Sequence, residues 1–141
     1  MTSTDRDALR QQLIRHESDR LKPYVDSVGK ITIGVGRNLT DKGISAAESR
    51  MLLDADINDA ILDLSTFSWF ADLDVVRQRA LLDLCHNIGL PRLKGFVKML
   101  AAIARKDWDA AAHELLDSRY AQQVGHRAST LAAMLRTGEA S

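Results

Sequence analysis

The chain has 141 residues, 45% of them hydrophobic, and a formal net charge of +0 at pH 7. This length can supply one compact core but is short for two independent domains, so we expect a single domain that can divide into two lobes. Net neutrality and few aromatic side chains argue against a dedicated nucleic-acid-binding protein.

The beginning of the chain, Met1 to Asp5, leads directly into a charged segment, without the apolar stretch that a secretory signal requires. No apolar run elsewhere approaches the thickness of a bilayer, so we expect no membrane insertion. Cys85 is the single cysteine, which excludes an intramolecular disulfide. Leucines surround it, and Cys85 is therefore predicted to be a small buried hydrophobe rather than a nucleophile.

A first helix is predicted at residues 5–18. Leu9, Leu13 and Glu17 stand four residues apart, which places them on one face, and we expect this face to point toward the core. A carboxyl group in a partly apolar wall is favoured in its protonated form, as a general acid near neutral pH requires. Glu17 is therefore a candidate acid catalyst; the alternative is a partly buried acid that an arginine holds in place.

A short antiparallel sheet is predicted to follow this helix. Pro23 favours extended backbone, residues 27–30 have the composition of a turn, and the residues around Thr32 alternate as a strand does. Asp26 lies beside this turn. On its own it fits a turn-forming aspartate, and β-propensity explains Thr32 equally well.

The combination of Glu17 and Asp26 is more informative than either residue. Cleavage of a glycosidic bond requires two carboxyl groups at one cleft, one to protonate the leaving oxygen and one to handle water or the sugar cation. Different elements carry these two acids, so the sequence favours a glycosidase.

The rest of the chain is predicted to be helical. Ser45 and Glu48 form a capping-box pattern that begins a connecting helix at about residues 45–65. Asp74 can cap a helix that Gly89 and Pro91 close. The further helices are expected at about residues 92–104, 107–118 and 126–136. The fold class is therefore α+β, mostly helical, with a small N-terminal antiparallel sheet.

Other chemistries do not fit the spacing of their motifs. The segment that begins His113-Glu114 resembles a zinc-binding helix, but Asp117 stands where the second histidine should be, so we expect no metal site. Gly34-Val35-Gly36 lacks the third glycine of a nucleotide-binding loop, and we expect no cofactor.

The spacing of Glu17, Asp26 and Thr32, followed by Gly34-Val35-Gly36, resembles the bacteriophage-type lysozymes, the muramidases of the T-even endolysin family. Further segments resemble the same family: Asn87-Ile88-Gly89, Gly95-Phe96, Trp108 to Ala111, and Arg127 to Gly138. The resemblance covers about residues 9–138.

The resemblance implies a two-lobed lysozyme-like fold. Its small β-containing lobe would span about residues 17–44, and the connecting helix would follow at about residues 45–65. The helical lobe, at about residues 74–138, would pack with the N-terminal helix of residues 5–18.

The resemblance also implies an activity. In the family the glutamate is the general acid, and the aspartate and threonine position the attacking water, roles that carry over to Glu17, Asp26 and Thr32. The implied reaction cleaves the β-1,4 bond between N-acetylmuramic acid and N-acetylglucosamine of bacterial peptidoglycan, with inversion and without cofactor or metal. We expect a monomer that stays in the host cytoplasm until a holin or cell lysis releases it to the wall.

Two further residues are candidates for substrate binding. Asn87 is predicted to hydrogen-bond a sugar N-acetyl group, although it is equally compatible with a helix C-terminal residue next to Gly89. Arg127 is expected to pair with Glu17 or with the hairpin; otherwise it is a surface arginine near a helix start.

Two departures from the family pattern leave an alternative function open. Arg37 stands where many relatives have histidine, and we expect it to pair with Asp54 or Asp56 of the connecting helix. The connection after Thr40 is also short. The alternative is a weakly active or inactive wall-binding module that keeps the lysozyme fold.

Overall fold

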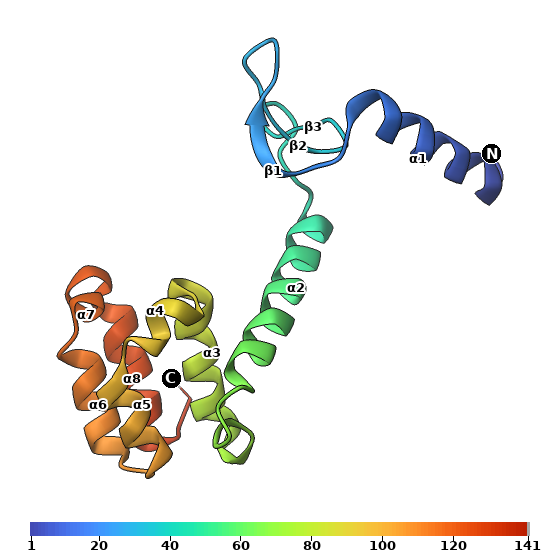
Figure 1. Cartoon of the computed structure of the whole chain (residues 1–141). Coiled ribbons are helices and arrows are strands. Elements are labelled where there is room, and N and C mark those ends of the chain that lie inside the picture. Colours follow the sequence, from blue (N-terminus) through green and yellow to red (C-terminus); the bar gives the residue numbers. More distant parts are fainter. Residues whose placement is uncertain (141) are drawn as a thin grey trace. The chain divides into compact units, whose positions relative to one another are not determined.

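The structure, a computed structural model, describes residues 1–140. The chain forms two units, Met1–Met51, here called the N-terminal unit, and a helical unit that begins at Leu52 (Figure 1). The predicted fold class, α+β with a small N-terminal antiparallel sheet, is confirmed. The packing of the N-terminal helix with the helical lobe stays a prediction.

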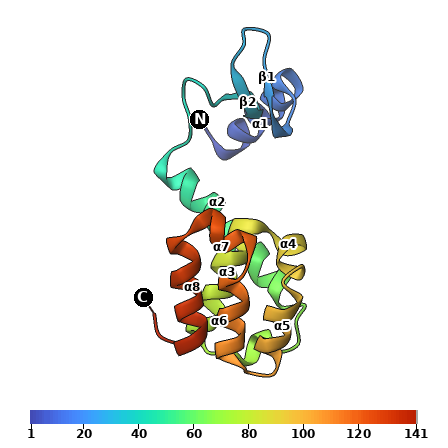
Figure 2. The ribbon, with the colours of Figure 1, turned by 90° about the vertical axis from the view of Figure 1, so that its left-hand side faces the viewer.

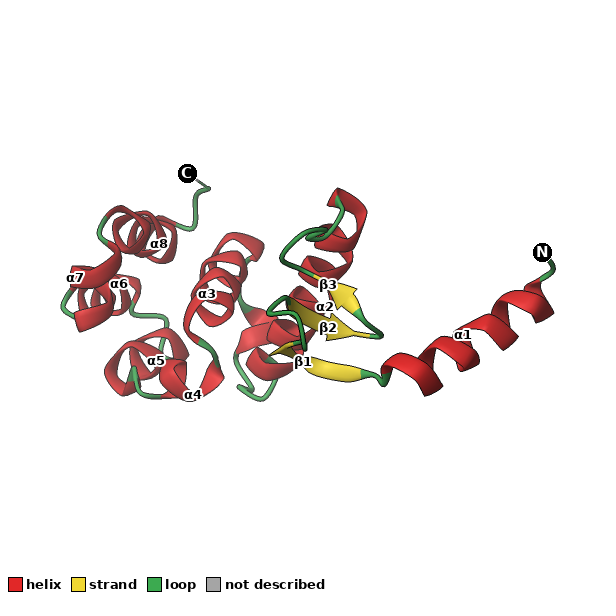
Figure 3. Cartoon of the chain, turned by 90° about the horizontal axis from the view of Figure 1, so that it is seen from above, coloured by secondary structure: helices red, strands yellow, loops and turns green. Residues whose placement is uncertain are grey.

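The first helix, α1 (Ser3–Glu17), begins at a capping box that the sequence analysis did not identify. The hydroxyl of Thr2 accepts the backbone N–H of Asp5 at 3.1 Å, and the Asp5 carboxylate accepts the N–H of Thr2 at 2.9 Å. The next residue, Ser18, caps the end of the helix, and its N–H donates to the carbonyl of Ile14. Figures 1 and 3 show that α1 runs away from the sheet that follows it, and no residue of α1 is buried.

The sheet has three antiparallel strands in chain order, β1 (Arg20–Val25), β2 (Ile31–Gly34) and β3 (Arg37–Asn38). Thr32 lies in the central strand, opposite Tyr24 on β1 and Asn38 on β3. It is also the only buried residue of the N-terminal unit. The unit therefore contains no apolar layer against which the Leu9 and Leu13 side chains of α1 could pack.

The second helix, α2 (Ala46–Leu64), starts at the predicted capping box. The Ser45 hydroxyl accepts the N–H of Glu48 at 3.1 Å, and Oε1 of Glu48 accepts the N–H of Ser45 at 2.9 Å. Its buried residues, Ala60 and Leu64, both lie in the helical unit. A short 3-10 helix, η1 (Phe70–Asp72), then leads to the helices that form the core.

The C-terminal part of α2 and six further helices enclose the core of the helical unit: α3 (Val75–Ile88), α4 (Leu90–Lys94), α5 (Val97–Ala104), α6 (Trp108–Leu116), α7 (Arg119–Val124) and α8 (His126–Thr137). Helix α6 packs against α5 and α8, and α3 packs against α8 (Figure 2). The largest fully buried side chains are Leu64, Leu81, Leu84, Leu93, Met99, Ile103, Leu115 and Leu135. None of the helices within residues 1–140 is long and apolar enough to cross a membrane.

The helices of this unit differ from the predicted ones in two places. The single helix expected at residues 92–104 is divided into α4 and α5, because the chain leaves helical geometry at Phe96. Helix α7 was not predicted: it has only six residues, too few for a periodic apolar pattern. The hydroxyl of Ser118 caps it by accepting the N–H of Ala121 at 3.1 Å.

Candidate active site

The three predicted catalytic residues all belong to the N-terminal unit, and three consecutive elements carry them. Glu17 is the last residue of α1, Asp26 follows β1, and Thr32 lies within β2. The predicted binding residues Asn87 and Arg127 belong to α3 and α8 of the helical unit.

Asp26 and Thr32 are brought together by the backbone of Lys30. Oδ1 of Asp26 accepts the N–H of Lys30 at 2.8 Å and the N–H of Val28 at 3.0 Å. The carbonyl of Lys30 in turn accepts the N–H of Asp26 at 2.9 Å and the hydroxyl of Thr32 at 3.1 Å. Both predicted side chains are therefore fixed against one residue of the hairpin.

The two oxygens of Asp26 have different surroundings. Oδ1 forms the turn, as the alternative interpretation of this residue expected, through its bonds to Val28 and Lys30. Within the N-terminal unit, Oδ2 accepts no hydrogen bond from the protein. The same carboxylate can thus hold the turn with one oxygen and accept a hydrogen bond from water with the other.

Thr32 is 3% exposed, and its hydroxyl donates to the Lys30 carbonyl. A hydroxyl has one donor hydrogen and two acceptor lone pairs. With the hydrogen directed at Lys30, the Thr32 oxygen can only accept hydrogen bonds from any other group. The β-strand explains why a threonine is tolerated here, and the bond to Lys30 fixes the direction of its hydroxyl.

Within the N-terminal unit no apolar wall surrounds Glu17, and the expected apolar wall around it stays a prediction. Its side chain is exposed, and Leu9 and Leu13 on the same face of α1 are 38% and 43% exposed. The physical reason is that the N-terminal unit has no apolar layer to cover that face. Glu17 lies instead against the turn between β2 and β3, where its carboxylate is in close contact with Gly36.

The three candidates are arranged along strand β2. Asp26 flanks the turn that precedes the strand, Thr32 lies near its start, and Glu17 lies beside the turn that follows it. A strand of this length spans about 13 Å, so side chains from its two ends can contact the same sugar pair. Two carboxylates and a hydroxyl acceptor therefore border one short strand.

Arg37 does pair with an acid, but the predicted partners were wrong. Its guanidinium contacts Oε2 of Glu48 at 2.6 Å and donates to Oε1 of Glu48 at 2.9 Å. It also donates to the carbonyl of Gly43 at 3.3 Å. Glu48 was recognised only as a capping residue, and its carboxylate serves the helix cap and the β3 arginine together. The hydrogen bond from Arg37, with those from Ser45, lowers the pKa of Glu48 from 4.5 to about 2.

This pair predicts a specific pH dependence of stability. Because the folded-state pKa of Glu48 lies below its ordinary value, the stabilisation is complete above pH 4.5 and is lost as the pH falls toward 2. Glu48→Gln keeps an acceptor for Ser45 but removes the charge. We expect the Tm of wild type to exceed that of Glu48→Gln at neutral pH, and the difference to vanish between pH 4.5 and pH 2. A difference that does not change across this interval would exclude the pairing as its cause.

In the helical unit, Arg127 pairs with Asp83 of α3. Its Nε donates to Oδ1 of Asp83 at 2.8 Å, and a terminal nitrogen lies 2.6 Å from the same oxygen. Asp83 was not predicted as its partner, because a contact between residues 44 positions apart leaves no local pattern in the sequence. Asn87, one helical turn after Asp83, is exposed.

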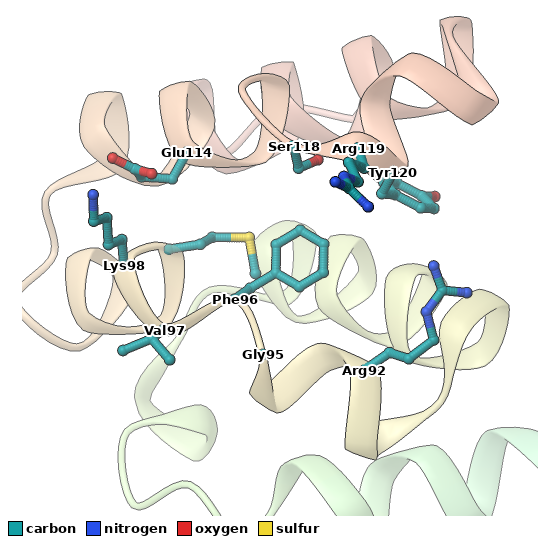
Figure 4. Close-up of a pocket in the computed structure, with 10 residues that line it drawn as sticks. Arg92, Gly95, Phe96, Val97, Lys98, Glu114, Ser118, Arg119 and Tyr120 are labelled. Atoms are coloured by element: carbon teal, nitrogen blue, oxygen red, sulfur yellow. The ribbon is translucent and has the colours of Figure 1, made fainter.

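The helical unit has two cavities of interest, and only one of them is lined by a predicted site residue. The larger, about 540 Å³, contains none of the predicted residues: Figure 4 shows Arg119 and Tyr120 along its upper side, with Phe96 and Arg92 below them. The second, about 400 Å³, is lined by Arg127 and Asp83. Within residues 1–140, no group of three or more His, Cys, Asp or Glu side chains is arranged to hold a metal ion.

Known proteins are similar to this chain over nearly its whole length. The family model described as phage lysozyme matches residues 14–137, a range that contains every predicted site residue. The chain is 27% identical to probable T4-type lysozyme 2 and 23% identical to probable T4-type lysozyme 1, both of Dictyostelium discoideum. Each of these alignments covers 93% of this chain and 95% of the relative.

A third relative is the pre-baseplate central spike protein Gp5 of Enterobacteria phage T4. It is 29% identical, over 93% of this chain and 28% of the spike protein. The similarity therefore concerns one part of that longer protein. Because the family model covers most of its length, the chain belongs to the phage lysozyme family.

Proposed function

We propose that this protein hydrolyses the β-1,4 bond between N-acetylmuramic acid and N-acetylglucosamine in bacterial peptidoglycan, by general acid–base catalysis. Family membership makes it a lysozyme-type hydrolase and implies peptidoglycan as its substrate. The specific bond and the acid–base mechanism are supported by the placement of Glu17, Asp26 and Thr32 along strand β2.

Glu17 is the proton donor in this proposal. Its carboxyl group is exposed, so it can reach the glycosidic oxygen of a bound polymer. Donation of its proton neutralises the leaving alkoxide as the bond breaks, which is the role of the acid in glycoside hydrolysis.

Asp26 and Thr32 orient the attacking water. A water molecule donates one hydrogen to Oδ2 of Asp26 and the other to the Thr32 oxygen, whose own hydrogen is committed to Lys30. Its lone pair is then directed away from both acceptors and toward the anomeric carbon, while Asp26 accepts the proton released by the attack. Attack by water on the face opposite the leaving group inverts the anomeric configuration.

Asn87 and Arg127 are proposed as substrate-binding residues. The exposed amide of Asn87 offers both a donor and an acceptor to an N-acetyl group. Arg127 is oriented by Asp83 and lines a cavity, which reduces the entropy lost when its guanidinium contacts a ligand.

Addition of the pure protein to permeabilised bacteria tests the proposed activity. Turbidity should fall as the wall is cut, and Glu17→Gln should bind walls without clearing the suspension. The alternative, a wall-binding module, predicts that the wild-type protein sediments with the walls and leaves the turbidity unchanged.

Cys85→Ala provides a test of the thiol in the same assay. Cys85 is 4% exposed, which confirms its predicted burial, and burial raises the pKa of the thiol with a further contribution from Asp63. The variant should clear walls as wild type does and lose about 1 kcal/mol of unfolding free energy, because it removes a buried sulfur. A folded but inactive Cys85→Ala protein would contradict this assignment.

A further inference from the structure

We infer that Gly36 is a positioning residue for Glu17, and that the absence of a side chain at this position sets where the general acid lies. The inference rests on the proposed role of Glu17 and adds a determinant of its geometry. Gly36 belongs to the turn between β2 and β3, with a φ of +69°.

The contact between the two residues leaves no room for a methyl group. A Cβ atom on Gly36 would lie 2.7 Å from Oε2 of Glu17, 2.9 Å from Cδ and 3.1 Å from Cγ. Ordinary contacts of this kind begin at 3.4 Å. The atom that would have to yield is the end of a flexible side chain, so the fold can accommodate the methyl group but the carboxylate cannot stay in place.

Little else in the described structure fixes this carboxylate. Within the N-terminal unit it forms no hydrogen bond or ion pair. Its backbone, by contrast, is held at the end of α1, where Ser18 has a φ of +64° and donates its N–H to the carbonyl of Ile14 at 2.9 Å. A non-glycine residue in this sparsely populated conformation persists only where its surroundings determine it. The position of the Glu17 carboxylate is therefore set by two features: the fixed backbone at the end of α1 and the space left by the missing side chain of Gly36.

Displacement of the acid matters because proton transfer depends on geometry. Oε2 would have to move by roughly 0.7 Å to reach an ordinary contact distance from a Cβ atom. A misplacement of about 1 Å can cost on the order of a hundredfold in rate. Gly36→Ala should therefore lower kcat and leave KM nearly unchanged, because it alters the acid and not the surface that binds the polymer.

The chain offers two matched controls. Gly34 and Gly43 have φ values of +64° and +63°, close to that of Gly36, and a Cβ atom on either would have nothing within 4 Å. Alanine at these positions introduces the same backbone strain without touching Glu17. Any loss of kcat specific to Gly36→Ala thus reports the contact and not the strain.

The test uses the full chain carrying Gly36→Ala, Gly34→Ala or Gly43→Ala, with Gly36→Ala also made in the Glu17→Gln background. We expect similar losses of Tm in the three alanine variants, and a loss of kcat of about tenfold to a hundredfold in Gly36→Ala alone. In the Glu17→Gln background, Gly36→Ala should cause no further loss, since the group it displaces no longer donates a proton.

If Gly36→Ala prevents folding, Gly36→Asn is compared with Gly34→Asn instead, because asparagine tolerates a positive φ better than alanine does. Equal kcat losses at positions 36 and 34 would overturn the positioning role. So would an undiminished effect of the Gly36 substitution in the Glu17→Gln background. Wild-type turnover by Glu17→Gln itself would refute the proposed function instead, so the two failures are distinguishable.

Discussion

Glu17→Gln is expected to lower the rate of peptidoglycan hydrolysis by about a hundredfold to ten-thousandfold while the protein still binds walls. Glutamine keeps the size of the side chain and its contact with Gly36, but it has no transferable proton. The loss should therefore appear in kcat, with KM little changed. Release of soluble fragments from purified walls measures the rate, and sedimentation with the walls measures binding.

A matched control for this substitution is Glu139→Gln, which neutralises an exposed glutamate outside the proposed site. It should hydrolyse walls at the wild-type rate. If folded Glu17→Gln does so too, Glu17 is not the proton donor and the wall-binding alternative gains support.

Asp26→Asn is expected to reduce turnover by about a hundredfold or more with little loss of stability. The side-chain oxygen of the introduced asparagine can still accept the N–H groups of Val28 and Lys30, so the hairpin turn is kept. What is lost is the charge that accepts a proton from water. Combined with Glu17→Gln, the two losses should be far from additive, because both residues serve one chemical step.

Asp26→Ala separates the catalytic function of Asp26 from its function in the turn. It removes the turn bonds as well as the charge, so it should lower Tm more than Asp26→Asn does and be at least as inactive. If Asp26→Asn instead hydrolyses walls normally and only Asp26→Ala is impaired, the aspartate is a turn residue and has no part in the reaction.

Local patterns in the sequence predicted several features correctly. The alternation around Thr32 placed the strand, and the spacing of Ser45 and Glu48 placed the start of α2. Cys85 among leucines predicted burial. Each of these depends on residues a few positions apart, where backbone geometry fixes which side chains meet.

The features that were missed depend on contacts beyond this range. The apolar stripe of Leu9 and Leu13 predicted a partly apolar wall around Glu17, which stays a prediction, because a stripe specifies only that a face is apolar and not what covers it. Asp54 and Asp56 were predicted as the partners of Arg37, although Glu48, which caps the start of the same helix, is nearer in the chain. The close contact of Glu17 with Gly36 could not be predicted, since a glycine signals an unusual backbone and does not identify the neighbour that needs the space.

Identification of the new chain ends is the most direct test of the proposed reaction. Purified peptidoglycan is digested with the wild-type protein, the products are reduced with borohydride, and the reduced sugars are identified by mass spectrometry. The proposed cleavage produces N-acetylmuramic acid at every new reducing end, and Glu17→Gln should produce almost none. New reducing ends on N-acetylglucosamine, or walls bound by the protein but left without new ends, would contradict it.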